Sequence, residues 1–90
     1  MHRTRYGAAK IQCTDGRTAK LWYNLLCETR GRRTCFGVEI VMLRGGERQS
    51  ACVRDLAASQ RQAEWVLAKL CRNTVTPCML YEVLEELLAR

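Results

Sequence analysis

The spacing of apolar residues changes once along this 90-residue chain, near Asp55. Before Asp55, apolar and polar residues alternate with a period of two, which is typical of strands with one buried face. After it, apolar residues recur every three or four positions, as in amphipathic helices. The chain is therefore expected to place its strands first and its helices second, in an α+β domain.

Three strands are expected, at residues 20–28, 34–43 and 47–54. Alternation gives the first two an apolar inner face made of Leu21, Tyr23, Leu25, Cys27, Phe36, Val38, Ile40 and Met42. Gly45-Gly46 joins the second strand to the third. Two glycines favour a tight hairpin there, because both can take positive φ at little steric cost.

Two amphipathic helices are expected, at residues 60–72 and 77–89. Ser59 and Gln62 form a capping box before the first, and Thr76 is expected to cap the second, with Pro77 at its first position. Neither helix can bury its apolar stripe alone. We predict a helical hairpin packed on one face of a three- or four-stranded antiparallel meander. The leucines expected to face the sheet are Leu70, Leu84 and Leu87.

Residues 1–19 form a basic segment ahead of the single α+β domain of residues 20–90. Two states of this segment fit its sequence: it is flexible, or it adds a strand. In the second case residues 8–13 (AAKIQC) would fold over the outer sheet face and cover it.

Length and composition restrict the class of protein. Ninety residues form one domain, too small for a large enclosed active site. The 48% of hydrophobic and 27% of charged residues are typical of folded globular chains. No apolar run reaches the roughly 18 residues of a membrane span, and none follows the opening MHRTRYGAAKIQC. We expect a soluble cytoplasmic protein with no membrane partner.

The net charge of +6 is unevenly placed along the chain. Residues 1–33 hold eight Lys or Arg against Asp15 and Glu28, so the whole excess lies in the N-terminal third. This asymmetry favours electrostatic nucleic-acid binding, with Tyr6 and Trp22 available to stack on bases. The candidate contacts are Arg3, Arg5, Arg17, Lys20, Arg30, Arg32 and Arg33. No nucleic-acid-binding motif accompanies them, and basic tails often serve only solvation.

Six cysteines stand at positions 13, 27, 35, 52, 71 and 78, and no two form a C-x-x-C pair. Because the only histidine is His2, we expect neither a metal site nor a cofactor. Alternation places Cys27 on the inner face and Cys35 on the outer face of neighbouring strands, so these two should not bond. Cys27 and Cys71 are interpreted as small buried hydrophobic residues.

Cys78 is the candidate reactive thiol. In the first turn of a helix, free N–H groups and the helix dipole favour its thiolate. A nucleophile also needs a base, and no suitable histidine exists. The acids near Glu85 fit the solvated face of a helix, and RGGER lacks the Lys-Ser/Thr of a phosphate loop. We therefore expect no enzyme, no catalytic residue and no small-molecule ligand.

Four large apolar residues are expected to be exposed. Trp65 lies opposite the apolar stripe of its helix, and the other three, Trp22, Leu26 and Val41, lie on the outer sheet face. Exposed aromatic residues mark contact surfaces. These residues favour a protein-interaction or regulatory module that binds a protein partner or forms a homodimer, with nucleic-acid binding as the alternative.

Several short motifs from residue 21 to residue 88 resemble a family of small bacterial proteins of unknown function, found mostly in anaerobic spore-formers. They are FGVE (36–39), Asp55-Leu56, LCRN (70–73), Thr76-Pro77, Leu80 and VLEE (83–86). The chain departs from the family in Met79, in its extra cysteines and in its long basic N-terminus. The resemblance implies the order of strands then helices and a reducing cytoplasmic setting, and it implies no activity.

Overall fold

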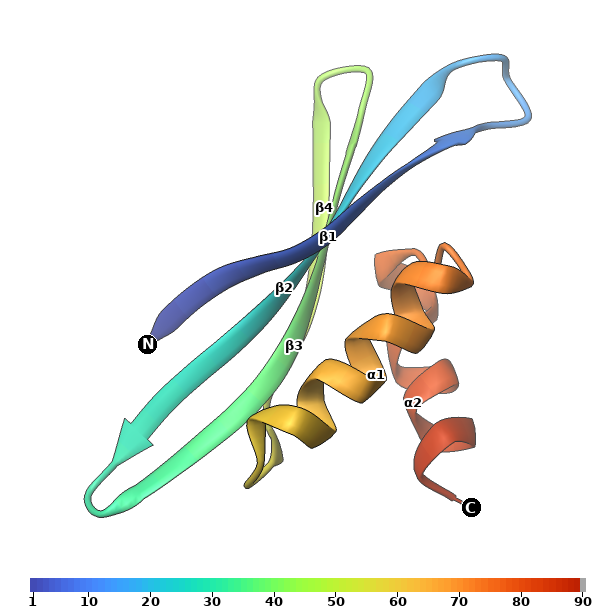
Figure 1. The fold of residues 1–90 in the computed structure, drawn as a ribbon. Coiled ribbons are helices and arrows are strands. Elements are labelled where there is room, and N and C mark those ends of the chain that lie inside the picture. Colours follow the sequence, from blue (N-terminus) through green and yellow to red (C-terminus); the bar gives the residue numbers. More distant parts are fainter. Residues whose placement is uncertain (90) are drawn as a thin grey trace.

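A computed structural model describes residues 1–89 as a four-stranded antiparallel sheet followed by helices (Figure 1). The strands β1 (His2–Gln12), β2 (Thr18–Arg30), β3 (Arg33–Arg44) and β4 (Glu47–Ala57) are neighbours in chain order. Helix α1 (Gln60–Arg72), the short 3-10 helix η1 (Pro77–Met79) and helix α2 (Leu80–Leu88) follow. The predicted α+β class, meander and C-terminal helices are confirmed.

The strands are longer than their apolar cores. Strands β2 and β3 pair from Ala19–Arg44 to Arg30–Arg33, so the ladder continues past the buried positions into charged residues. Their turn contains only Gly31 and Arg32. Gly45 and Gly46, between β3 and β4, both have positive φ (56° and 87°), as their hairpin requires.

Residues 1–19 contain β1, which lies beside β2 at the edge of the sheet. Its pairing runs from His2–Cys27 to Gln12–Thr18, with an irregularity between Arg5 and Gly7. Of the two alternatives for this segment, the added strand is confirmed and the flexible segment is not. The strand extends the edge of the sheet, however, so the expectation that residues 8–13 would cover the outer face is wrong. The physical reason is that β1 satisfies the backbone N–H and C=O groups along the edge of β2.

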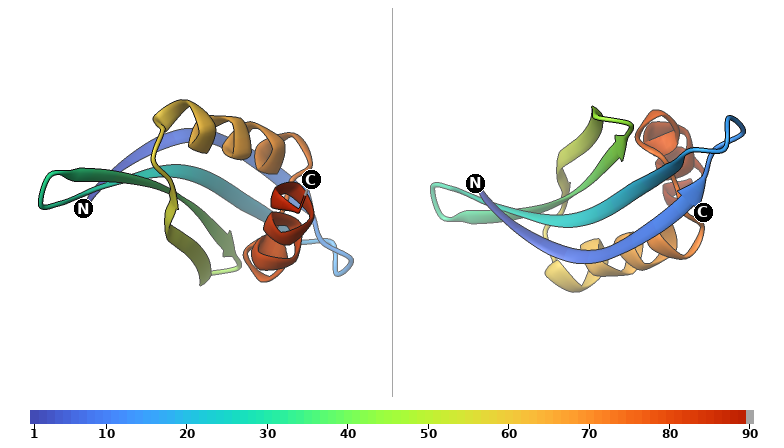
Figure 2. Two further views of the ribbon diagram at one scale, coloured as in Figure 1. Left: turned by 90° about the horizontal axis from the view of Figure 1, so that it is seen from below. Right: turned by 90° about the horizontal axis from the view of Figure 1, so that it is seen from above.

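Both helices lie on the same side of the sheet (Figure 1), and the strands curve past them (Figure 2). Leu70 and Leu84 are buried there, and Leu87 is half-buried. The link between the helices is held by Tyr23, whose hydroxyl donates to the carbonyl oxygen of Val75 over 3.0 Å. The core of the inner face comprises Ala19, Leu21, Tyr23, Val38, Ile40, Met42, Val66, Leu67, Leu70, Val75, Leu80 and Leu84.

The two helix starts differ. Ser59 caps α1, since its Oγ accepts from the backbone N–H of Gln62 at 3.4 Å. Thr76 precedes η1 in an extended conformation, but its side chain makes no cap bond and contacts Cys78 Sγ at 3.4 Å instead. The expected helix over 77–89 is corrected to a 3-10 turn followed by α2. Such tight turns are frequent at helix ends.

Among residues 1–89, no helix combines the length and the apolar character that crossing a membrane requires.

Candidate functional site

The sheet face that the helices leave uncovered, the open face, carries alternate side chains of all four strands. Cross-strand pairing sets Arg5 opposite Asn24, Asn24 opposite Glu39, and Glu39 opposite Cys52. By the same alternation, this face holds eight cations: Arg3, Arg5, Lys10, Lys20, Arg30, Arg33, Arg48 and Arg54.

Within residues 1–89, the open face thus holds eight of the fifteen Lys and Arg residues of the chain and three of its nine acids: Glu28, Glu39 and Asp55, which is hydrogen-bonded to Cys35 on this face. Its net charge of +5 is most of the +6 of the whole chain. Glu28 forms ion pairs with Arg30 at 3.4 Å and Arg54 at 3.7 Å, which places the Arg54 side chain on this face.

The structure gathers five of the seven predicted nucleic-acid contacts on the open face. The other two lie in turns: Arg17 between β1 and β2, near Asp15 at 3.9 Å, and Arg32 between β2 and β3. Counting charge by thirds of the chain missed the open-face cations Arg48 and Arg54, and the candidate contacts left out Lys10. Strand alternation is the signal that identifies Arg48, since it lies opposite Leu43, one of the outward positions of β3.

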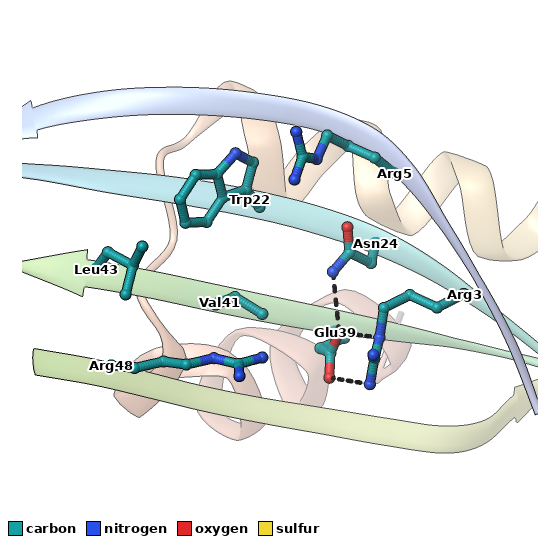
Figure 3. A pocket seen from close by; sticks show the side chains of 8 residues that line it. All are labelled: Arg3, Arg5, Trp22, Asn24, Glu39, Val41, Leu43 and Arg48. Atoms are coloured by element: carbon teal, nitrogen blue, oxygen red, sulfur yellow. Dashed lines mark hydrogen bonds and ion pairs between the residues drawn. The ribbon is translucent and has the colours of Figure 1, made fainter.

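A shallow pocket of about 340 Å³ lies in the middle of the open face (Figure 3). Its wall combines guanidinium groups, an indole and a buried carboxylate. The lining residues are Arg3, Arg5, Trp22, Asn24, Glu39, Val41, Leu43 and Arg48.

A polar network crosses three strands at one end of this pocket. The carboxylate of Glu39 accepts a hydrogen bond from Arg3 Nη2 at 3.1 Å and forms an ion pair with Arg3 Nε at 2.7 Å. It also accepts from Asn24 Nδ2 at 2.9 Å. The Glu39 side chain is 8% exposed and that of Arg3 is 49% exposed. A carboxylate this deeply placed needs such partners, because desolvating an unpaired charge is costly.

Trp22 is half-buried in the centre of the open face, with the guanidinium of Arg5 5.2 Å from its ring centroid. The expected exposure of Leu26 and Val41 is wrong, since both are buried. Val41 lies directly opposite Trp22. Leu26 lies opposite Gly37, where the β4 backbone comes so close that an added Cβ would sit 2.1 Å from the Val53 carbonyl oxygen.

Trp65 is 49% exposed, on the outer side of α1, with Lys69 Nζ 5.5 Å from its ring centroid. It lines an open groove of about 580 Å³ between α1 and α2, the helical groove. The groove is formed by Gln62, Trp65, Lys69, Leu87 and Leu88. Two of the four proposed partner contacts, Trp22 and Trp65, thus reach the surface, on opposite layers of the molecule.

The thiols are scattered. Cys78 is exposed on η1, where its Sγ contacts the hydroxyl of Thr76. Cys27 lies opposite Phe36 and Cys35 opposite Glu28, on opposite faces as alternation predicts. A hydrogen bond with Asp55, together with burial, raises the pKa of the Cys35 thiol, which keeps it protonated. Within residues 1–89, no three His, Cys, Asp or Glu side chains come close enough to hold a metal ion.

These features define an α+β domain with one helix-covered sheet face and one basic, open sheet face. Residues 3–90 match a family model described as "Family of unknown function (DUF6514)", and the chain belongs to that family. The match includes nearly all of β1, so the basic N-terminal strand is part of the family's domain rather than an addition to it. No curated protein and no solved structure matches the chain significantly.

Proposed function

We propose that this protein is a non-enzymatic cytoplasmic binding module that holds single-stranded nucleic acid on its open face. The observation that carries the proposal is that one face of the sheet holds +5 of the net charge of +6, around the half-exposed ring of Trp22. Cations attract the phosphate chain, and an aromatic ring offers a stacking surface to any base.

The shape of the open face supports this ligand. The molecule is 47 Å long and 17 Å thick, and the sheet hairpins extend beyond the helices (Figure 1). A face of this length has room for several nucleotides of an extended strand. Its cations come from β1, β2, β3 and β4, so they are spread over the whole face rather than gathered on one strand.

A homodimer through the open face is less well supported than the sequence suggested. Two copies would bring their excess positive charge together, and like charges repel. Leu26 and Val41, which were expected to supply apolar contact area, are already buried within one copy. The ligand that complements the open face is therefore anionic.

A mixed-sequence single-stranded oligonucleotide tests the proposal at low and then at higher salt. Lys20→Gln with Arg48→Gln should weaken binding and lower the slope of log K against log salt by about 1.4, for two lost phosphate contacts. Arg61→Gln with Arg72→Gln is the matched control, since it removes the same charge from exposed positions of α1. Absence of binding at low salt, or an equal loss in both double variants, would contradict the proposal.

The second candidate is self-association through the helical groove, which we propose from its exposed Trp65 and Leu88, both 49% exposed. Helix α1 carries a net positive charge, whereas α2 carries three acids and no base. A two-fold axis that sets α1 against α2 of a second copy would bring opposite charges together.

Sedimentation over a range of concentrations tests this second candidate. Trp65→Ala should weaken the dimer, whereas Met79→Ala, a change at another exposed apolar residue outside the groove, should leave it intact. A wild-type protein that stays monomeric at every concentration removes this candidate.

A further inference from the structure

We propose that Trp22 and Asn24 form a subsite for a single nucleobase, which stacks on the indole and donates a hydrogen bond from its exocyclic amino group to Asn24 Oδ1. The inference rests on the proposed function, since it specifies which part of the nucleic acid enters the pocket. It assigns Arg3 and Glu39 as positioning residues for Asn24.

The orientation of the Asn24 amide follows from its neighbour. The ionised carboxylate of Glu39 has only acceptor oxygens, so the amide must turn its NH₂ group toward it. Asn24 Oδ1 is then forced to the other side, and Figure 3 shows it pointing away from Glu39. A hydrogen bond and an ion pair from Arg3 hold Glu39 in turn, so the chain Arg3–Glu39–Asn24 fixes an acceptor on the open face of the sheet.

This acceptor is still available. Asn24 Oδ1 receives no hydrogen bond from residues 1–89, and no buried polar side-chain atom in that range lacks a partner. Asn24 as a whole is 7% exposed, so this oxygen keeps a small opening to solvent. An acceptor that is oriented before binding, without a protein donor of its own, selects ligands that bring a donor.

Trp22 and the flanking cations give the subsite its remaining features. The indole lies next to Asn24 along the pocket wall, with one side of its ring system turned toward the viewer in Figure 3. Arg5, from β1, adds a second planar group, and both aromatic and guanidinium planes stack on bases. Arg48, from β4, borders the opposite side, where it can pair with a phosphate.

The hydrogen-bond chemistry predicts a preference. Cytosine, adenine and guanine each carry an exocyclic amino group, whereas thymine has oxygen acceptors in the equivalent positions. Cytosine and thymine have the same ring size, so comparison of the two isolates the amino group from stacking area. Oligo(dC) should bind about threefold to tenfold more tightly than oligo(dT) of equal length, the range expected for one hydrogen bond.

The experiment measures both oligonucleotides by quenching of Trp22 fluorescence, in a Trp65→Phe background that leaves Trp22 as the only tryptophan. Asn24→Leu should abolish the preference for oligo(dC). Glu39→Gln should reduce or invert it, because a neutral amide lets Asn24 turn its NH₂ group outward toward thymine O4. Trp22→Leu, followed by anisotropy of labelled oligonucleotides, should weaken binding of both and keep their ratio.

The outcomes separate this inference from the proposed function. Salt-dependent binding with equal affinity for oligo(dC) and oligo(dT) would overturn the base subsite and leave the nucleic-acid proposal standing. A preference that survives Asn24→Leu in a folded variant would also overturn it. No binding of either oligonucleotide at low salt would remove both ideas together.

Discussion

The two faces of the sheet are closed in different ways. On the inner face, α1 and α2 cover apolar side chains such as Leu21 and Ile40, which are fully buried. On the open face, long side chains of the sheet itself cover their neighbours. The residues buried there are both polar and apolar: Glu39 and Val41 are each 6% exposed. The comparison shows that a sheet face without helices over it can still bury some of its side chains.

The largest expected effect lies on the inner face. Leu70→Ala should lower the free energy of unfolding by about 2–5 kcal/mol, because it leaves a cavity under α1. Leu43→Ala, at a 36% exposed position of the open face, is the matched control and should cost less than about 0.5 kcal/mol. Chemical denaturation measures both; similar losses would show that the two faces are equally well packed.

At one position the open face should tolerate substitution less well than the inner face, and two glycines test this expectation. Gly37→Ala should cost about 3 kcal/mol, because the new Cβ would meet rigid β4 backbone. Gly7→Ala, where the Cβ would lie 3.1 Å from the flexible side chain of Cys71, should cost clearly less. Thermal melts of the two variants compare these losses of stability. A larger loss for Gly7→Ala than for Gly37→Ala would mean that the β4 backbone moves easily near Gly37.

Arg3→Ala should lower the free energy of unfolding by about 2 kcal/mol. It removes one of the two partners of the Glu39 carboxylate, which is nearly buried, and leaves only Asn24. Adding Glu39→Gln should recover part of that loss by removing the unpaired charge. Denaturant titrations of the single and double variants measure this coupling. Independent, additive losses would show that the network is no more than a surface ion pair.

The hydrogen bond from Tyr23 to Val75 in the inner core makes stability depend on pH. Burial raises the pKa of Tyr23 from its usual 10.0 to about 12. Above pH 10 the unfolded chain loses this proton while the folded chain keeps it, so stability should fall as pH rises from 10 to 12. Tyr23→Phe should lower the free energy of unfolding by about 1 kcal/mol at neutral pH and reduce its decrease between pH 10 and 12. Denaturant titrations of both proteins across this pH range measure the effect, and the same decrease in the variant would show that Tyr23 is not its cause.

The smallest effect is expected at the helical surface. Trp65→Ala should change the unfolding free energy of the monomer by less than about 0.5 kcal/mol, because half of the side chain already faces water. Melting at a concentration too low for self-association measures it. A loss as large as that of Leu70→Ala would place Trp65 in the core and weaken the case for a contact surface.

Much of the fold could be predicted because periodicity reports which side of an element is buried. The inner residues of β2 and β3 and the bounds of α1 follow from alternation and from the Ser59 cap. The position of β1 could not be predicted, since its edge pairing satisfies backbone groups that leave no pattern in side chains.

The open face was predicted only in part. Its tryptophan and five of its cations were identified, but the burial of Glu39 and its pairing with Arg3 were not. Its burial depends on Arg3, 36 positions away, and on the curvature that brings β1 across to it. The alternation of side chains along a strand reports neither contacts between residues far apart in the chain nor the curvature of the sheet.

The order of the strands also affects how the chain acquires its structure. Every strand pair joins neighbours along the chain, so the sheet can assemble hairpin by hairpin while the ribosome is still extending the polypeptide. Helices α1 and α2 follow all four strands, and the contact from Tyr23 to Val75 spans 52 residues. A nascent chain that has completed β4 therefore presents a finished sheet with a bare apolar side, a stage at which it is open to aggregation and suited to a chaperone.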